Sequence, residues 1–297
     1  MSTLRRAVGA ALLAVATAGV FTPSVNAATT GTATSTNPWH TGHTLVIPHG
    51  GGDGMYPENT LLAYEKTMAM GADVVDVDLQ LTKDKVLVAF HDDSMKRTTN
   101  GTGSIRALTL AEVKKLDAGF NFTIAGKQPF RGKSVTVPTL EEILKRFPTT
   151  LLSLDFKNES KEMIQPACAL LTKYRRAGNT FVGSNNDAQI LSFRTVCPGI
   201  PTSATMVDVY ASRDARASGD PNFRPDTVVD QPPYRIGTNT LVNAEGLAWS
   251  HSHGIAILTW VVNDEKDMRH LVDIGVDGIY TSYPDKLLRV LGRPIPK

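Results

Sequence analysis

The sequence predicts an α/β protein with the architecture of a (β/α)8 barrel and a small inserted subdomain after the second strand. From residue 44 onward, short apolar runs alternate with segments of helical spacing, which gives roughly eight βα units in 297 residues. Acidic residues and histidines stand where several apolar runs end, as expected when parallel strands carry them to one rim. An open doubly wound sheet is the competing architecture, but no glycine-rich dinucleotide loop follows the first strand.

The first half of the predicted barrel begins with a strand at 45–49. A helix is expected at 59–70, because apolar residues recur there at helical spacing and Gly71 supplies a stop. Apolar runs at 74–81 and 86–90 predict two strands joined by a polar turn. Residues 92–138 interrupt the alternation, carry several glycines and contain only a short helix-like stretch at 108–116, so they form the predicted insertion.

The alternation resumes after the insertion. Strands are expected at 151–156, 180–183, 202–209, 227–230, 255–262 and 278–281. Helices are expected at 140–146, 161–177, 187–196, 242–253, 265–274 and 285–291, with a weaker helical piece at 211–218. The barrel domain is therefore assigned to residues 43–297.

The first residues have the pattern of a targeting segment. Arg5 and Arg6 precede an apolar run at 7–20 and the small-residue sequence Val-Asn-Ala, so residues 1–27 read as a secretory signal peptide and the protein is expected to be extracellular. This run is short for a bilayer span, and no later segment is apolar enough, so no integral membrane segment is expected. Residues 28–42 are interpreted as a flexible leader because the segment is rich in Thr, Ser, Ala and Gly.

Charge and cysteine content narrow the possible partners. Loss of residues 1–27 lowers the formal charge from +2 to 0, which disfavours binding to nucleic acid or to anionic membranes. A monomer is expected. Cys168 and Cys197 are the two cysteines, and export favours a disulfide between them, whereas a pair of buried thiols is the alternative.

Candidate catalytic residues gather at predicted strand ends. His49 and His91 end two apolar runs, and acid–base chemistry at neutral pH suits histidine. Asp76 and Asp78 are two apart on one strand and share a face, and Asp155 ends another strand. Three carboxylates at one rim repel one another unless a cation neutralises them, and hard oxygen ligands favour Ca²⁺ or Mg²⁺.

These residues and their spacing resemble the glycerophosphodiester phosphodiesterase family. The matching sequences are His-Gly at 49–50, Pro-Glu-Asn-Thr at 57–60, Gly-Ala-Asp at 71–73, Asp-Val-Asp at 76–78, Leu-Thr-Lys-Asp at 81–84, His-Asp at 91–92, Leu-Asp-Phe-Lys at 154–157, Trp-Val-Val-Asn at 260–263 and Gly-Val-Asp-Gly-Ile at 275–279. The resemblance spans nearly the whole chain after the signal segment. It implies a TIM barrel whose insertion would be residues 92–138.

The resemblance also implies an activity and a set of roles. The family cleaves glycerophosphodiesters to glycerol phosphate and an alcohol with the help of a divalent ion. By position, Asp76, Asp78 and Asp155 would hold the ion, with Glu58 as a further ligand or beside it. His49 and His91 would be the acid–base pair, one taking a proton from the glycerol hydroxyl that acts as internal nucleophile and the other protonating the departing alcohol.

Two more residues would bind substrate, and three positions depart from the family pattern. Lys157 would neutralise phosphate charge and Trp260 would supply an apolar wall for the glycerol. Gly50 stands where the family usually has arginine and offers only a backbone donor, so another cation, Lys157 alone or Arg97 from the insertion, would have to compensate. Aspartates replace more frequent glutamates at two metal positions, and a serine replaces a frequent aspartate near the last strand.

Alternatives remain open for several residues. Lys157 could face water at a strand end, and Trp260 could pack in the core. His251 and His253 are interpreted as an exposed helix end rather than a metal site, and His40 and His43 receive no role. A lysophospholipase D-like enzyme, and a catalytically weakened barrel that binds phospholipid head groups or protein partners, are the alternative functions; Gly50 alone favours the latter.

Overall fold

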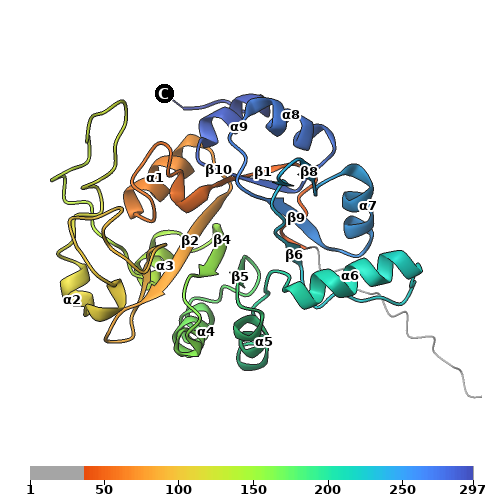
Figure 1. The fold of residues 1–297 in the computed structure, drawn as a ribbon, viewed down its shortest axis with the longest axis horizontal. Helices are drawn as coiled ribbons and strands as arrows, with labels where there is room; N and C mark the ends of the chain where they lie inside the picture. Colours follow the sequence, from red (N-terminus) through yellow and green to blue (C-terminus); the bar gives the residue numbers. More distant parts are fainter. Residues whose placement is uncertain (1–36, 297) are drawn as a thin grey trace, which may run out of the picture. The chain divides into compact units, whose positions relative to one another are not determined.

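The computed structural model describes residues 37–296. The predicted signal peptide at 1–27 and most of the leader predicted at 28–42 lie outside the described residues. Parallel strands occupy the centre of the described domain and the larger helices lie outside them (Figure 1). These parallel strands are β1 (Leu45–Pro48), β2 (Val74–Leu81), β4 (Leu151–Phe156), β5 (Thr180–Ser184), β6 (Val229–Asp230), β9 (Ala256–Thr259) and β10 (Gly278–Thr281).

The strands follow the order of a (β/α)8 barrel. One sheet runs β3-β2-β4-β5, where β3 (Leu87–Ala89) is antiparallel to β2, and the other runs β1-β10-β9-β6. Single parallel bridges join β5 to Thr202 and Ser203 to β6, so residues 202–203 fill the position between the two sheets. At the other junction the Asp73 N–H donates to the Val46 carbonyl at 3.0 Å. The predicted barrel order is therefore present.

The strand predicted at 202–209 is wrong beyond its first two residues. Helix α6 (Met206–Ser218) begins there instead. The Thr205 N–H donates to Asp208 Oδ2 at 2.7 Å, and the Asp208 N–H donates to Thr205 Oγ1 at 3.2 Å, which is a reciprocal capping box. This local capping of the first helical turn outweighs the alternating pattern on which the strand prediction rested.

Helices cover the strands where the sequence predicted them. They are α1 (Leu61–Met70), α3 (Leu140–Arg146), α4 (Ile164–Lys173), α5 (Asp187–Val196), α7 (Ala244–Ser252), α8 (Glu265–Asp273) and α9 (Pro284–Val290), with the short η3 (Lys161–Met163) before α4. Their starts follow capping side chains. Thr60 accepts a hydrogen bond from the Ala63 N–H, so α1 begins at Leu61 rather than at the predicted residue 59.

The alternation of side chains along the strands separates two environments. Val75, Val77 and Leu79 of β2 face outward and pack against helices in a large apolar cluster. Val74 faces inward and joins an apolar cluster in the lower part of the barrel. Asp76 and Asp78 are the next two residues of the inward set, and they therefore lie above this cluster, toward the carboxyl ends of the strands.

The leader prediction for residues 28–42 is wrong at its C-terminal end. Trp39 is fully buried and packs edge-on against Phe181, with ring centroids 4.7 Å apart. The Asn37 side chain donates to the Val228 and Gly254 carbonyls at 2.7 and 2.9 Å. The buried indole of Trp39 and the hydrogen bonds of Asn37 together hold these residues against the barrel, because burying a large aromatic side chain is strongly favourable.

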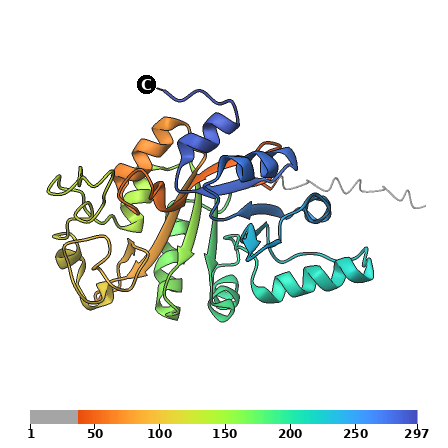
Figure 2. The ribbon, with the colours of Figure 1, turned by 45° about the horizontal axis from the view of Figure 1, so that its top comes forward.

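Residues 92–138 form the predicted insertion beside β2. Its regular elements are η2 (Ile105–Ala107) and α2 (Leu110–Val113), and both views place it to one side of the strands (Figures 1 and 2). It has a small apolar cluster of its own, in which Ile105, Val113 and Val137 are buried together with Val88 and Phe90 from the β3 segment. The insertion is therefore anchored to the hairpin that carries His91.

A disulfide joins Cys168 of α4 to Cys197 at the C-terminal end of α5, with a Cα–Cα distance of 5.7 Å. The bridge favoured from the sequence is thus formed, and the alternative of two buried thiols is wrong. Separately, none of the helices within residues 37–296 has both the length and the apolar character needed to cross a bilayer.

Candidate active site

A cavity of about 210 Å³ opens where β1 and β2 end. Several of the candidate residues from the sequence meet there, although they come from distant parts of the chain. The lining residues are His49, Gly50, Asp53, Glu58, Asp78, His91, Asp92 and Arg97. Catalytic groups of barrel enzymes lie at this end of the strands, so the cavity is the candidate active site.

His49 directly follows β1 and begins the short η1 (His49–Gly51). Its Nδ1 lies 3.1 Å from Asp53 Oδ2. Burial works against the charged imidazole, but the hydrogen bond to Asp53 and the charges of Asp76 and Asp78 raise the pKa of His49 to about 9. With Nδ1 held by a carboxylate, Nε2 is the nitrogen left for proton transfer.

The second histidine reaches the cavity through the β2–β3 hairpin. Because β3 runs antiparallel to β2, the chain returns along β2, and the Phe90 N–H donates to the Asp78 carbonyl at 2.8 Å. His91 follows, and its Nδ1 lies 2.7 Å from Asp92 Oδ1. Each candidate catalytic histidine thus has a carboxylate partner on the same ring nitrogen. Sequence reasoning missed Asp53 and Asp92 in this role, although Asp53 lies four residues and Asp92 one residue after its histidine.

Asp76 and Asp78 lie almost completely buried on the inner face of β2, at 5% and 3% exposure. Asp76 Oδ2 accepts a hydrogen bond from the Gly50 N–H at 3.0 Å. Burial and the neighbouring Asp78 charge raise the pKa of Asp76 to about 6. Asp155 on β4 is in register with Asp78. The two aspartates of β2 therefore form a concentrated negative site at the base of the cavity.

The Pro-Glu-Asn-Thr turn supports this site through its side chains. Asn59 adopts a left-handed backbone conformation with φ of 54°. Its Nδ2 donates to Asp78 Oδ2 at 2.7 Å, and its Oδ1 accepts hydrogen bonds from the Asp78 N–H and the Tyr64 hydroxyl. Asn59 was missed as a site residue, although its position inside a matching motif was a signal. It fixes the position of Asp78.

Lys157 lies in the site and does not face water. Its Nζ is 2.6 Å from Asp155 Oδ2 and 3.1 Å from Asp78 Oδ1, and its side chain is 16% exposed. Burial opposes the charge, but these two carboxylates raise the pKa of Lys157. Burial, opposed by Lys157, also raises the pKa of Asp155. The lysine therefore carries its charge into the acidic site.

Arg97 comes from the insertion and reaches the same cavity. Its Nη1 and Nη2 donate to the two Glu58 carboxylate oxygens at 2.6 Å each. Its Nε donates to Asp92 Oδ2 at 2.7 Å. The hydrogen bonds to Glu58 and Asp92 raise its pKa. Arg97 therefore brings a fixed positive charge to the site in which Gly50 has no side chain.

The backbone at Gly50 explains why a glycine suits this position. Its φ is 53°, in the left-handed region that favours glycine, and its N–H is directed to Asp76 rather than into the cavity. A Cβ there would lie 3.5 Å from both Glu58 Cβ and Asn59 Nδ2, which is ordinary contact. The cost of a side chain at this position is thus conformational and not steric.

Trp260 follows β9 and does not belong to the core, since 44% of its surface is exposed. Its Nε1 donates to the Gln231 carbonyl at 2.6 Å, which holds the indole at the strand end. The alternative of plain core packing is therefore wrong. The role of Trp260 as a wall for the glycerol remains a prediction.

The donor set of the site suits a hard divalent cation. Asp76, Asp78, Asp155 and Glu58 offer only carboxylate oxygens. Burial, and then the neighbouring Asp78 charge, raise the pKa of Asp76, and a cation would relieve the repulsion between the two carboxylates. In the described residues Lys157 pairs with Asp78 and Asp155, and Arg97 pairs with Glu58. Ion binding would require these pairs to loosen. The four ligands stay a prediction.

The barrel carries two histidines, each hydrogen-bonded to a carboxylate, above a group of aspartates at the bottom of the cavity. This arrangement is typical of the active site of a hydrolase. The sequence comparison makes the family specific. A model of the Glycerophosphoryl diester phosphodiesterase family matches residues 49–286, so the chain belongs to this family and is a phosphoric diester hydrolase. Enzymes of this family are generally dependent on a divalent metal.

Individual relatives agree with the family. The Glycerophosphodiester phosphodiesterase of Bacillus subtilis is 32% identical over 260 residues, which covers 83% of this chain and 86% of the relative. Lysophospholipase D GDPD1 of Homo sapiens is 26% identical over 271 residues and covers 81% and 84% of the two chains. A phosphodiesterase of Oleispira antarctica, solved in complex with sn-glycerol-3-phosphate, superposes with a TM-score of 0.67 at 24% identity, covering 84% of this chain and 97% of that one. The likeness to the O. antarctica structure supports the barrel fold.

Proposed function

We propose that this protein is a metal-dependent hydrolase of glycerophosphodiesters that releases glycerol 3-phosphate and an alcohol by histidine acid–base catalysis. The observation that carries the proposal is the cavity in which His49 and His91, each paired with a carboxylate, lie together with Asp78 and Glu58. Paired histidines suit a reaction in which one proton is removed and another is delivered. The B. subtilis relative carries this activity in its name.

Two histidines allow a balanced sequence of steps. One imidazole takes the proton of the free glycerol hydroxyl, whose oxygen attacks phosphorus while the bond from phosphorus to the alcohol oxygen breaks. The other imidazole protonates that leaving oxygen. A water molecule then opens the cyclic phosphate with the two histidines in exchanged roles. Asp53 and Asp92 keep each ring oriented through both steps.

The cationic side chains and the metal share the phosphate charge. Lys157 lies beside the aspartates at the bottom of the cavity, and Arg97 lies on the side of the insertion. Together they supply the positive charge that the family usually takes from an arginine at the position of Gly50. Asp76, Asp78, Asp155 and Glu58 would hold Ca²⁺ or Mg²⁺. When bound, the ion stabilises negative charge that develops on phosphate oxygens.

A lysophospholipase D-like specificity is the second candidate. The human relative bears that name, and Trp260 leaves an exposed indole near the carboxyl ends of the strands. A lysophospholipid differs from a simple glycerophosphodiester by one acyl chain, which needs apolar surface beside the site. A weakened, binding-only barrel is less well supported, because both histidines and all predicted carboxylates are present.

Export and association state are part of the same proposal. The pattern of residues 1–27 supports secretion of the protein through a cleaved signal peptide. A disulfide between Cys168 and Cys197 suits an oxidising compartment. We propose that the protein acts outside the cell as a monomer on small substrates and not on nucleic acid.

The deciding experiment compares substrates. Purified protein is incubated with glycerophosphocholine, glycerophosphoethanolamine or lysophosphatidylcholine, with Ca²⁺, with Mg²⁺ or with EDTA, and glycerol 3-phosphate and lysophosphatidic acid are quantified. Metal-dependent glycerol 3-phosphate from the first two substrates supports the proposal. Faster release of lysophosphatidic acid supports the lysophospholipase D specificity. No product from any substrate with either metal would refute both.

A further inference from the structure

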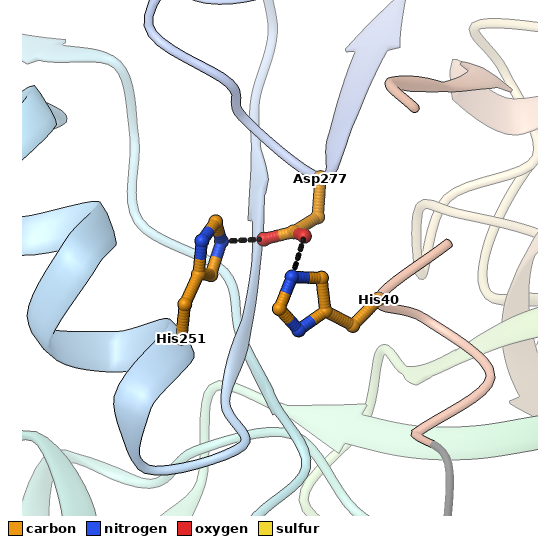
Figure 3. Close-up of side chains that lie close together, drawn as sticks. All are labelled: His40, His251 and Asp277. Carbon is orange, nitrogen blue, oxygen red and sulfur yellow. Dashed lines mark hydrogen bonds and ion pairs between the residues drawn. The ribbon is translucent and has the colours of Figure 1, made fainter. Parts of the chain in front are cut away.

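A second cluster of metal-type side chains lies at the opposite end of the barrel from the active site. It consists of His40, His251 and Asp277 (Figure 3). Asp277 directly precedes β10, and His40 precedes β1, so both lie where strands begin. His251 lies in the last turn of α7. The sequence interpretation gave His40 no role and treated His251 as part of an exposed helix end. In the structure both rings approach one buried carboxylate, and His251 is half-buried rather than exposed.

The three side chains lie close enough together to supply a ligand set. His251 Nε2 is 2.8 Å from Asp277 Oδ2, and His40 Nε2 is 3.7 Å from Asp277 Oδ1. The two imidazoles lie against each other with ring centroids 4.3 Å apart. One ligand atom from each residue can be chosen so that all lie within 4.8 Å. Ligands ~2.0–2.2 Å from a tetrahedral Zn²⁺ are roughly 3.3 Å apart, so small side-chain movements suffice.

Hydrogen bonding alone does not account for His40. At 3.7 Å its Nε2 is beyond hydrogen-bonding distance from Asp277, and within residues 37–296 its ring makes no other hydrogen bond. Asp277 is only 4% exposed, and the Ile257 N–H donates to its Oδ2 at 2.8 Å. The carboxylate is thus held in place by the backbone of β9, as ligating carboxylates commonly are.

Space and residue type indicate the occupant. The three side chains, together with His43, line a cavity of about 310 Å³. Two imidazole nitrogens with one carboxylate oxygen favour zinc or a similar transition metal over Ca²⁺ and Mg²⁺, which the all-oxygen catalytic set favours. A fourth position remains for water or for the nearby His43.

We propose that His40, His251 and Asp277 form a zinc-class metal site, distinct from the catalytic site, that fastens the segment before β1 to α7 and β10. The segment is already anchored by Trp39, and the metal would link it to two further elements. This position is remote from the cavity that holds His49 and His91. Bound metal is therefore expected to act on stability and to leave turnover nearly unchanged.

The test uses the purified protein without a polyhistidine tag. Bound zinc is measured by equilibrium dialysis and elemental analysis in the wild type, in His40→Ala and in His253→Ala. His253 is the matched control, since it is close to His251 but stacks on Trp249. We expect His40→Ala to bind one equivalent fewer than the other two. Equal zinc content in all three proteins, at micromolar or at millimolar zinc, would overturn the proposal.

Two further readouts keep the test independent of catalysis and of misfolding. Zinc about 100-fold above Kd should raise Tm of the wild type by roughly 5 °C and leave Tm of His40→Ala unchanged. Co²⁺ should give visible absorption of a tetrahedral nitrogen-containing site in the wild type and in His253→Ala, but not in His40→Ala. Hydrolysis by His40→Ala at 25 °C should stay within about twofold of the wild type. A cobalt spectrum of His40→Ala that equals that of the wild type would contradict the assignment.

Discussion

Arg97 and Glu58, 39 residues apart in the chain, face each other through two parallel hydrogen bonds of 2.6 Å each. One residue comes from the insertion and the other from the turn before α1. The pair places a guanidinium in the cavity that the first histidine enters, where Gly50 brings no side chain. The insertion thus contributes to the active site a positive side chain that Gly50 does not provide.

Replacement of Arg97 is expected to weaken phosphate binding. Arg97→Ala should lower kcat/KM by about 10- to 100-fold, because a charge-assisted, forked donor is lost. Arg97→Lys should recover only part of this, since lysine keeps the charge but not the fork. Steady-state kinetics measures both, with the glycerophosphodiester or lysophospholipid that the wild type turns over fastest in the substrate comparison. Arg106→Ala, in the same insertion, is the control. A wild-type kcat/KM in Arg97→Ala would show that Arg97 has no part in substrate binding.

The two histidines are expected to be individually essential. His49→Ala and His91→Ala should each lower kcat by about 100- to 10,000-fold, the usual contribution of a general acid or base. His253→Ala should retain activity, since it lies outside the cavity. Stability must be compared by thermal unfolding, so that lost turnover is not confused with lost folding. A binding-only barrel would instead show no turnover in the wild type and little change in ligand affinity in either variant.

Chelation is expected to stop the reaction. EDTA should abolish product formation, and Mg²⁺ or Ca²⁺ should restore it, because an all-carboxylate ligand set prefers these ions. Asp78→Asn should raise the metal concentration needed for half-maximal activity by more than tenfold. Asp267→Asn, on α8 and paired with Arg235 outside the cavity, is the matched control for loss of a carboxylate. Full activity after exhaustive dialysis against EDTA would rule out metal dependence.

The pKa of His49 predicts how stability depends on pH in metal-free protein. The folded-state pKa is about 9 against 6.5 for a free imidazole, so the folded protein binds more protons between these values. This proton uptake contributes up to about 3 kcal/mol to the free energy of unfolding. The contribution is complete below about pH 6.5 and is lost as pH rises through 9. Urea unfolding at several pH values should show this loss in the wild type but a flatter profile in His49→Gln. If stability changes with pH in the same way in the wild type and in His49→Gln, the raised pKa of His49 would be contradicted.

The disulfide is expected to matter for stability and not for catalysis. Cys168 and Cys197 close a loop with a sequence separation of 29, for which chain entropy gives about 3–4 kcal/mol. The Cys168→Ser, Cys197→Ser double variant should therefore unfold at lower urea concentration, with kcat unchanged for the folded protein. Equal midpoints for wild type and variant, under oxidising conditions, would show that the bridge contributes little.

Local pattern determined most of the architecture. The spacing of apolar residues was enough to predict the alternating strands and helices, and the period of two along β2 put Asp76 and Asp78 on one inner face. These features depend on interactions between residues close in sequence, which a single chain reveals. The error at 202–209 has the same local origin, because the capping box of Thr205 and Asp208 was overlooked.

Contacts between distant segments were decided only by the tertiary structure. The sequence could name Arg97 as a candidate cation, but its pairing with Glu58 depends on how the insertion folds back. Likewise, His40 and Asp277 are 237 positions apart and come together because β1 and β10 are neighbours in the barrel. Closure of a barrel joins the two ends of the chain, and no local pattern encodes which side chains then face each other.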